Sequence, residues 1–350
     1  MLLVTRLWRS ALGRIGKSSA LAGHACNTPD NIDVLSQPSS KYTGRSRIGA
    51  PMKLLLALNP SDSNETTIRE VALRPWPIDT TLEVLSVVDI PELLAVPAVI
   101  AEATKQAEGV VLAAGKRLES SGLKPTLRVL LGDAKAVIAD RAKERGVDLI
   151  GVGAHRGVDA GPFLLGSVAK GVIRFAPCSV EVARAGKWSP ATGSNMRVLL
   201  AVDGSGGGMA AARSVAERSW PDGTEVRVLS VVEFELPMIQ SVLEPPYLPV
   251  QLLEALRVEA TKRSEEAVTA AVQLISRSGL KTSESVAASL ASSKQVILDE
   301  ARQWNADLIV LGSHGRKGIS RFLLGSVSEA VAMHAKCSVD IIRGHSGEHF

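Results

Sequence analysis

Short apolar runs alternate with longer amphipathic stretches along most of the chain. In the C-terminal part, runs of strand length lie at 198–202, 226–231, 284–288, 308–311 and 339–342. Between them, apolar residues recur at helical spacing over 207–218, 252–276, 292–304 and 327–334. Strands that alternate with helices are joined by right-handed crossovers into a parallel sheet. The pattern therefore predicts an α/β fold, with helices on both faces of a doubly wound sheet.

The same pattern occurs twice. The stretch Leu-Ser-Val-Val at 85–88 recurs at 229–232, Phe-Leu-Leu-Gly-Ser-Val at 163–168 recurs at 322–327, and Cys-Ser-Val at 178–180 recurs at 337–339. Trp76-Pro77 likewise recurs as Trp220-Pro221. The order of these matches is kept over the whole length, which indicates a duplicated domain. Each copy is predicted to hold a five-stranded parallel sheet.

The repeat sets the domain boundaries. Copy one is expected at 53–184 and copy two at 196–343, with a Gly-, Ser- and Pro-containing linker at 185–195 and a short tail at 344–350. Residues 1–51 precede the repeat, and their first 29 residues hold no acidic residue but several Arg and Ser. That composition suits an organelle-targeting segment. A plain disordered tail, or translation that starts at Met52, explains it as well.

Charge and cysteine content narrow the class of protein. The net charge is +4, but residues 1–51 hold seven basic and two acidic residues, so the rest of the chain is close to neutral. No basic patch for nucleic acid is expected there. Three cysteines without close spacing argue against a disulfide scaffold and favour a reducing compartment, the cytoplasm. No apolar stretch is long enough for a membrane span, so no membrane partner is expected.

Two glycine-rich loops in copy two follow predicted strands. Asp203 opens the first, at 203–208, and the second runs from Gly312 to Gly315. Glycines allow a positive φ and a close approach of the backbone to a ligand, so several N–H groups can point into one anion-binding concavity. Nine residues later, Gly325 and Ser326 open the last predicted helix, whose free N–H groups favour phosphate. Taken alone, such loops are as often simple turns as binding sites.

The spacing Gly-x2-Gly-x9-Gly-Ser resembles the ATP-binding signature of the universal stress protein family, and the resemblance covers both copies. It implies two tandem Rossmann-like (HUP-type) domains that pair through their last strands. The last strands would pair with each other in an intramolecular pseudo-dimer or across two chains, and a homodimer is expected. It also implies an adenine nucleotide, ATP with or without Mg²⁺, at the strand ends of copy two. Adenosine would lie at Asp203 and Val231. The full set implied for the nucleotide site is Asp203, Gly204, Ser205, Val231, Gly312, Ser313, Gly315, Arg316, Gly325, Ser326 and Val327.

Copy one departs from the signature. Asn59 replaces the aspartate and Arg156 stands where copy two has Gly315, although Gly153, Gly166 and Ser167 are kept. Weak or absent nucleotide binding is therefore expected in copy one. A shifted loop in which Gly157 takes over is the alternative.

The predicted function is binding of ATP by copy two, in a sensor or regulator linked to stress. No residue pair resembles a general base poised for hydrolysis, so no catalytic residue is assigned and any ATP hydrolysis should be slow. His155 and His314 lack partners at metal spacing, so no metal site is expected. Cys178 and Cys337 are expected to be small buried hydrophobes. A pure interaction module without nucleotide, and an adenylating or slow ATPase enzyme, are the alternatives.

Overall fold

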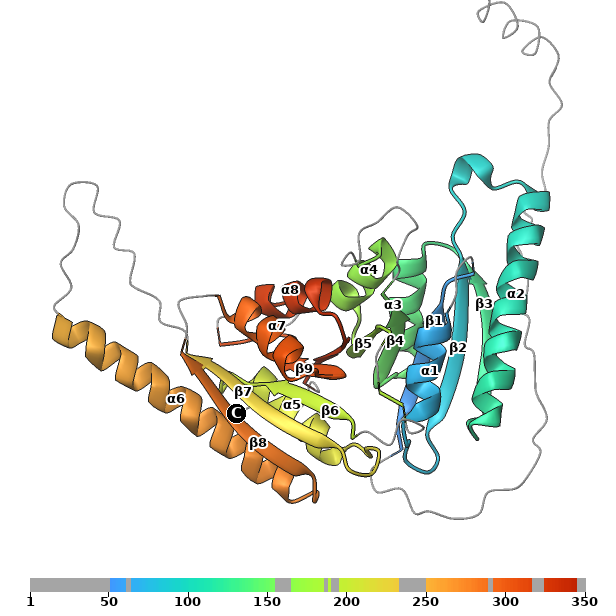
Figure 1. Ribbon diagram of the computed structural model, residues 1–350. Helices are drawn as coiled ribbons and strands as arrows, with labels where there is room; N and C mark the ends of the chain where they lie inside the picture. Colours follow the sequence, from blue (N-terminus) through green and yellow to red (C-terminus); the bar gives the residue numbers. More distant parts are fainter. Residues whose placement is uncertain are drawn as a thin grey trace, which may run out of the picture. The chain divides into compact units, whose positions relative to one another are not determined.

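A computed structural model of the chain describes residues 51–60, 64–154, 165–185, 188–189, 195–232, 250–288, 292–316 and 324–344. All of these belong to one structural unit. Figure 1 shows the elements in chain order, from blue at the start of the repeat to red at its end.

The first half of the repeat, residues 53–184, contains five strands and four α-helices. In order they are β1 (Lys53–Leu58), α1 (Glu65–Leu73), β2 (Thr81–Val88), the short 3-10 helix η1 (Glu92–Leu94), α2 (Pro97–Ser120), β3 (Pro125–Leu131), α3 (Ala134–Arg145), β4 (Leu149–Gly153), α4 (Ser167–Phe175) and β5 (Ser179–Ala183). Local signals mark the helix ends. Asp133 caps α3 by accepting from the N–H groups of Lys135 and Ala136, and Gly146 ends this helix with a positive φ.

The second half, residues 196–343, repeats this order. Its elements are β6 (Arg197–Ala201), α5 (Gly206–Glu217), β7 (Glu225–Val232), α6 (Val250–Ser276), β8 (Lys281–Ala288), α7 (Ser293–Gln303), β9 (Leu308–Gly312), α8 (Ser326–His334) and β10 (Ser338–Ile342). Every strand and helix predicted in this half is present, with ends that differ by at most a few residues. The proline-containing segment 234–249 is expected from the sequence to be a lid or an exposed loop, and it lies outside the described residues.

The ten strands form one sheet instead of two separate ones. Their order is β3-β2-β1-β4-β5-β10-β9-β6-β7-β8, parallel within each half. The halves meet where β5 and β10 pair antiparallel, with Glu181 opposite Asp340. The last-strand edges therefore satisfy each other within the chain, as an intramolecular pseudo-dimer. The homodimer remains a prediction.

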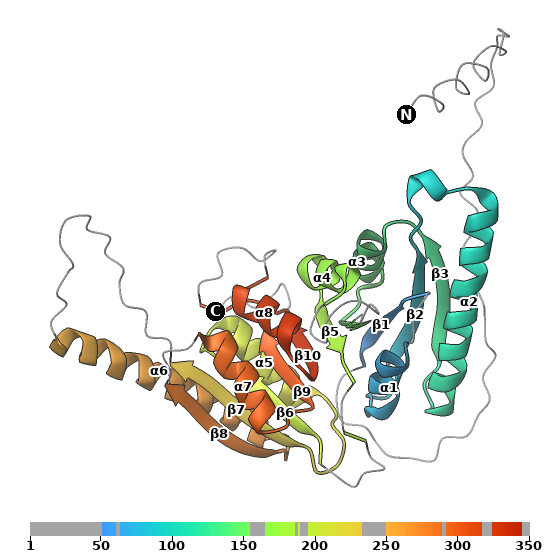
Figure 2. The same ribbon diagram turned by 45° about the horizontal axis from the view of Figure 1, so that its top comes forward.

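Helices cover both faces of the sheet (Figures 1 and 2). One apolar core continues across the junction between the halves and includes Ile138 of α3, Val172 of α4, Ile297 of α7 and Val331 of α8. On the other face each half has its own core, packed under α1 and α2 in the first half and under α5 and α6 in the second. The buried side chains are mainly Leu, Ile, Val and Ala, as the low aromatic content requires.

Equivalent residues of the two halves cross the junction reciprocally. Arg184, after β5, donates through Nη2 to the carbonyl of Ala332 in α8, and Arg343, after β10, donates to the carbonyl of Ile173 in α4. Each arginine thus satisfies a carbonyl of the last helix of the other half. The backbone N–H of Arg184 also donates to Ser338 Oγ, and that of Arg343 to the equivalent hydroxyl of Ser179.

A buried group of charges lies at the centre of the junction. Arg74 Nη1 lies 2.6 Å from Glu181 Oε2 and 4.0 Å from Asp340 Oδ2, while Arg218 Nη1 contacts the same oxygen of Asp340 at 2.5 Å. Glu70 adds a third carboxylate, 3.4 Å from Arg74 Nη2. Arg74 and Arg218 are equivalent positions of the two halves, as are Glu181 and Asp340. The junction therefore has an approximate twofold relation in its charges as well as in its backbone.

Candidate functional site

The candidate site lies where β6 and β9 end. These two strands are parallel neighbours at the centre of the second half, so their carboxyl ends meet at one edge of the sheet. The strand order also reverses here, because β6 is followed by β7 on one side while β9 leads to β10 on the other. In open α/β sheets, ligands bind in the crevice at such a switch point. The fold thus brings the two predicted glycine-rich loops together.

The Asp203 carboxylate connects the two loops. Its Oδ1 accepts from the backbone N–H of Ser205 at 3.0 Å and from the Ser205 hydroxyl at 2.5 Å. Its Oδ2 accepts from the backbone N–H of Arg316 at 3.0 Å, in the other loop. Ser205 Oγ in turn caps α5 by accepting from the N–H of Gly208. Asp203 was predicted to face a ribose or base edge, and here its oxygens bind the protein's own donors.

Close approach, and not a positive φ, accounts for the two loop glycines. Glycine allows a positive φ at Gly312 and Gly315, but neither has one; among the described glycines of the two loops, Gly204 has a positive φ, at 77°. A Cβ at Gly312 would lie 2.4 Å from the backbone carbon of Gly207, and one at Gly315 would lie 2.7 Å from Asp203 Oδ2. Side chains at these positions would collide with the first loop. Glycine is therefore required at both positions by the close packing of the two loops.

The last helix of the second half begins as predicted. Gly325 is the N-cap residue of α8, and no side chain caps the helix there. The Gly325 N–H donates to the Ser313 carbonyl at 2.8 Å, which joins the helix start to the glycine loop. Ser326 is exposed at the first helical position and Val327 is half-buried against the core. A helix start without a side-chain cap offers N–H groups and a positive dipole end to an anion.

Ser328 was missed in the sequence. Its hydroxyl donates to the Gly312 carbonyl at 2.7 Å and so fixes the end of β9 against α8. A serine two residues inside a helix gives no pattern by which this role could have been found.

Two further predicted site residues, Ser313 and Val231, are buried near the ends of β9 and β7. Ser313 is buried, its N–H donates to the Ile342 carbonyl, and its Oγ lies 2.9 Å from His314 Nδ1. Burial lowers the pKa of His314, and the positive charge of Arg343 lowers it further, so both favour the neutral imidazole. Val231 is a buried residue near the end of β7, the strand beside β6. Its contact with adenosine remains a prediction.

The first half has a different arrangement at the equivalent strand end. The Asn59 N–H donates to Asn64 Oδ1 at 2.9 Å, and Asn64 Nδ2 donates back to the Asn59 carbonyl at 2.8 Å. The helix α4 still begins at Ser167 after Gly166, as α8 does after Gly325. Arg156, Gly157 and His155 lie outside the described residues, so the predicted weakness of this half is not tested.

Other candidate sites are excluded or explained within the part of the chain that the structure describes. No cluster of three His, Cys, Asp or Glu side chains suits a metal ion there. Cys178 and Cys337 precede the last strand of each half, and burial raises the pKa of each thiol to about 12. Cys337 is buried as predicted, whereas Cys178 is only half-buried against the core. Among the helices of these residues, none has the length and apolar content needed to span a bilayer.

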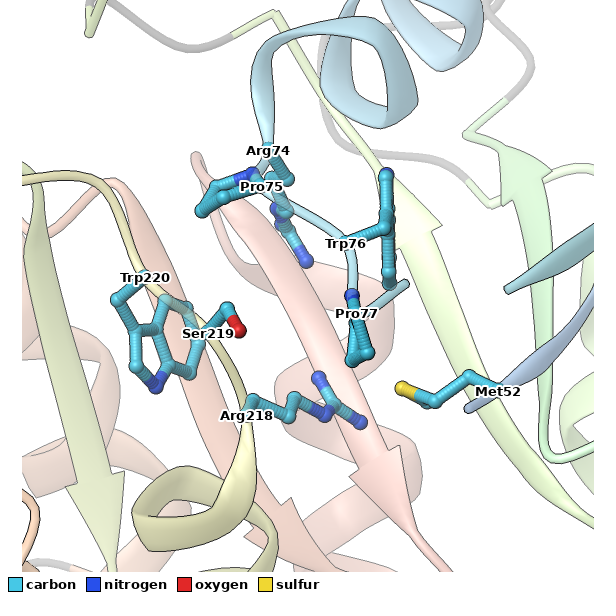
Figure 3. Close-up of a pocket in the computed structure, with 8 residues that line it drawn as sticks. All are labelled: Met52, Arg74, Pro75, Trp76, Pro77, Arg218, Ser219 and Trp220. Atoms are coloured by element: carbon cyan, nitrogen blue, oxygen red, sulfur yellow. The ribbon is translucent and has the colours of Figure 1, made fainter. Parts of the chain in front are cut away.

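A small hollow at the junction does not suit a nucleotide. Figure 3 shows its walls, formed by residues 74–77 of the first half and 218–220 of the second, with Met52. Its volume of about 10 Å³ is the room that one water molecule needs. The repeated Trp-Pro pair has a structural explanation here. Trp76 Nε1 donates to the Val71 carbonyl and Trp220 Nε1 to that of Val215, both at 2.8 Å.

Comparison with known proteins finds the same duplication. A family model described as the universal stress protein family matches residues 52–184 and again 194–343. A protein of Staphylococcus epidermidis that carries the universal stress protein name is 30% identical over 152 residues, which are 43% of this chain and 85% of that protein. A counterpart in Staphylococcus aureus is 29% identical over 148 residues, 42% of this chain and 82% of its own length.

Solved structures agree with the fold of the whole repeat. The crystal structure of a universal stress protein from Archaeoglobus fulgidus has a TM-score of 0.60 at 20% identity and covers 85% of this chain and 98% of its own. A crystal structure from Pseudomonas aeruginosa, of a protein described as functionally unknown, has a TM-score of 0.53 at 17% identity and covers 84% and 92%. At these identities the likeness concerns the fold alone.

Proposed function

Because the chain belongs to the universal stress protein family, we propose that it is an adenine-nucleotide-binding regulator or sensor of stress, and that its second half binds ATP. One observation carries the proposal: the glycine loop Gly312–Arg316 and the uncapped start of α8 meet at the switch point of the sheet. This combination presents backbone N–H groups at the place where α/β sheets bind phosphorylated ligands.

The proposed contacts divide between the parts of the nucleotide. The phosphates would lie against the loop residues Gly312, Ser313, Gly315 and Arg316 and the helix start at Gly325, Ser326 and Val327. The N–H groups of Ser313, Arg316 and Gly325 already donate within the protein, so the donors to phosphate would be the N–H groups of Gly315, Ser326 and Val327 and the Ser326 hydroxyl. The adenosine would lie over the ends of β6 and β7, near Asp203, Gly204, Ser205 and Val231. A Mg²⁺ ion would arrive with the phosphates, since the residues that the structure describes offer no acidic cluster of their own.

The second half is proposed to bind ATP without rapid hydrolysis. A general base must reach the attacking water and have a pKa near the working pH. Both oxygens of Asp203 already accept hydrogen bonds, and His314 is half-buried with Nδ1 on the Ser313 hydroxyl. Neither is positioned to take a proton from water. The two unpaired thiols of the repeat agree with a reducing compartment, and we propose the cytoplasm as the location.

Nucleotide identification tests the proposal directly. The full chain would be purified without added nucleotide, denatured, and analysed by mass spectrometry for bound adenine nucleotides, and ATP affinity would be measured by calorimetry on the stripped protein. Gly315→Arg should abolish binding, because its side chain enters the space beside Asp203 Oδ2. Gly206→Ala is the matched control, since a Cβ at Gly206 meets no atom within 4 Å. Equal ATP affinity of Gly315→Arg and the wild type would place the site elsewhere.

The second candidate is a protein-interaction module that binds no nucleotide. The Asp203 carboxylate favours it, because both of its oxygens already accept hydrogen bonds within the protein. If neither copurified nucleotide nor calorimetric binding of ATP, ADP or AMP is found, this second reading replaces the first. A phosphate-release assay on the same protein would reveal an enzyme.

A further inference from the structure

The Asp203 carboxylate lies at the contact between the first loop and the glycine loop Gly312–Arg316. Three donors from two chain segments converge on it: the N–H and hydroxyl of Ser205 and the N–H of Arg316. The Arg316 bond is the long-range one, between residues 113 positions apart. Charged acceptors make hydrogen bonds that are about twice as strong as those of neutral ones, so this carboxylate is a strong connection between the loops.

Two glycines enclose the carboxylate. A Cβ at Gly208 would lie 2.9 Å from Asp203 Oδ1, and one at Gly315 would lie 2.7 Å from Oδ2. On the same contact, a Cβ at Gly207 would lie 2.3 Å from the His314 carbonyl oxygen. The loops are therefore packed backbone to backbone around one side chain. Such packing fixes the glycine loop in the absence of any ligand.

We propose that Asp203 is a positioning residue, which holds the glycine loop against the start of α5 so that its N–H groups are arranged for phosphate before a nucleotide arrives. The effect on binding rests on the proposed function, whereas the effect on the loop does not. Asp203 thereby contributes to phosphate binding through the Arg316 segment. Its contribution is separate from any contact with the ribose.

The first half of the chain has lost both members of this contact. Asn59 replaces the aspartate and Arg156 replaces the glycine that lies against the carboxylate in the second half. The two positions that touch each other in the second half thus both differ in the first half.

An asparagine cannot replace Asp203 in this role. The three donors need three acceptor positions, and an amide presents one oxygen and one NH₂ group. Whichever way the amide is oriented, its NH₂ group faces either the Arg316 N–H or the Ser205 donors. Asp203→Asn therefore loses either the bond from Arg316 or the bonds from Ser205, so it weakens the connection between the loops while it keeps the size and shape of the side chain.

Hydrogen exchange and ligand affinity together test the proposal. Exchange of the segment 312–316 would be followed by mass spectrometry on the full chain without nucleotide, for the wild type, Asp203→Asn and the control Asp133→Asn. Asp133 Oδ1 accepts from two backbone N–H groups at the start of α3, and an asparagine oxygen can accept the same two bonds, so the control makes the same substitution without removing a connection between loops. Asp203→Asn should speed exchange in 312–316 by about tenfold or more, and Asp133→Asn should leave that segment unchanged.

The affinity arm distinguishes positioning from contact. If Asp203 acts through the glycine loop, Asp203→Asn should weaken ATP binding about tenfold or more and adenosine binding much less. Equal losses for the two ligands would mean a ribose contact and would overturn the proposal, as would unchanged exchange in 312–316. If Asp203→Asn speeds exchange in 312–316 while the wild type itself binds no ATP, Asp203 remains the residue that holds the loop. Only the nucleotide function is then refuted. Should Asp203→Asn not fold, Arg316→Pro removes the donor instead, and the same two outcomes decide.

Discussion

The buried charges at the junction between the halves make stability depend on pH. Glu181 is 4% exposed. Burial raises the pKa of its carboxyl to about 8; the nearby Arg74 and Arg218 guanidinium groups oppose this rise, and the negative charges of Asp340 and Glu70 add to it. Arg69 also acts on Glu70, whose pKa burial raises as well. We therefore expect Glu181 to carry a proton in the folded protein at neutral pH.

The sign and size of the effect follow from proton linkage. In the unfolded chain a glutamate has a pKa of about 4.3. Between that value and about 8 the folded state binds a proton that the unfolded state has released, so stability falls as pH rises. The slope is about 1.4 kcal/mol per pH unit well below the folded pKa, which gives a loss of about 2 kcal/mol between pH 6 and pH 8. Above the folded pKa the slope disappears.

Urea unfolding of the wild type and Glu181→Gln, followed by circular dichroism from pH 6 to pH 9, measures this loss. The neutral glutamine removes the titration, so the variant should gain about 2 kcal/mol relative to the wild type between pH 6 and pH 8. Glu225→Gln is the control, because its hydrogen bond with Lys281 lowers the pKa of Glu225 and it does not titrate in this range. Parallel curves for wild type and Glu181→Gln would show that Glu181 is ionised at neutral pH and would refute the reasoning.

Two further predictions concern packing and thiol chemistry. Gly207→Ala should destabilise the chain by about 1–3 kcal/mol, because its Cβ meets the carbonyl oxygen of His314 at 2.3 Å. Gly206→Ala should change the stability by less than about 1 kcal/mol. Urea unfolding of both variants measures the two changes. Burial raises the pKa of Cys178 and of Cys337 to about 12, so in a Cys26→Ser background neither thiol should react with a thiol reagent at pH 8 until the protein is unfolded. Rapid labelling of the native protein would contradict this burial.

The order of strands and helices was predictable because the parallel sheet is buried on both faces. Its strands read as continuous apolar runs such as Leu308–Gly312, and the intervening helices show a 3.6-residue period. The duplication showed the same order of strands and helices twice, which strengthened the prediction. The sequence left open whether the last strands pair within one chain or between chains, since that choice depends on the path of the linker and not on the strands themselves.

The candidate site was predictable in its parts but not in its contacts. Loops that follow neighbouring parallel strands must meet, so Asp203 and Gly312 were correctly expected near each other. The hydrogen bond from Arg316 to Asp203 depends on backbone placement across 113 residues, which no local pattern encodes. For the same reason the hydrogen bond from Arg74 to Glu181, 107 residues apart, had no sequence signal.

The pairing of β5 with β10 inside a single polypeptide has an evolutionary consequence. In a symmetric dimer of identical subunits every mutation occurs twice, so the residues that face each other across the twofold axis must be compatible with themselves. Here a glutamate at 181 stands opposite an aspartate at 340, a combination that two identical subunits could not have. Covalent linkage removes this constraint, because a substitution in one half need not be compatible with the same substitution in the other.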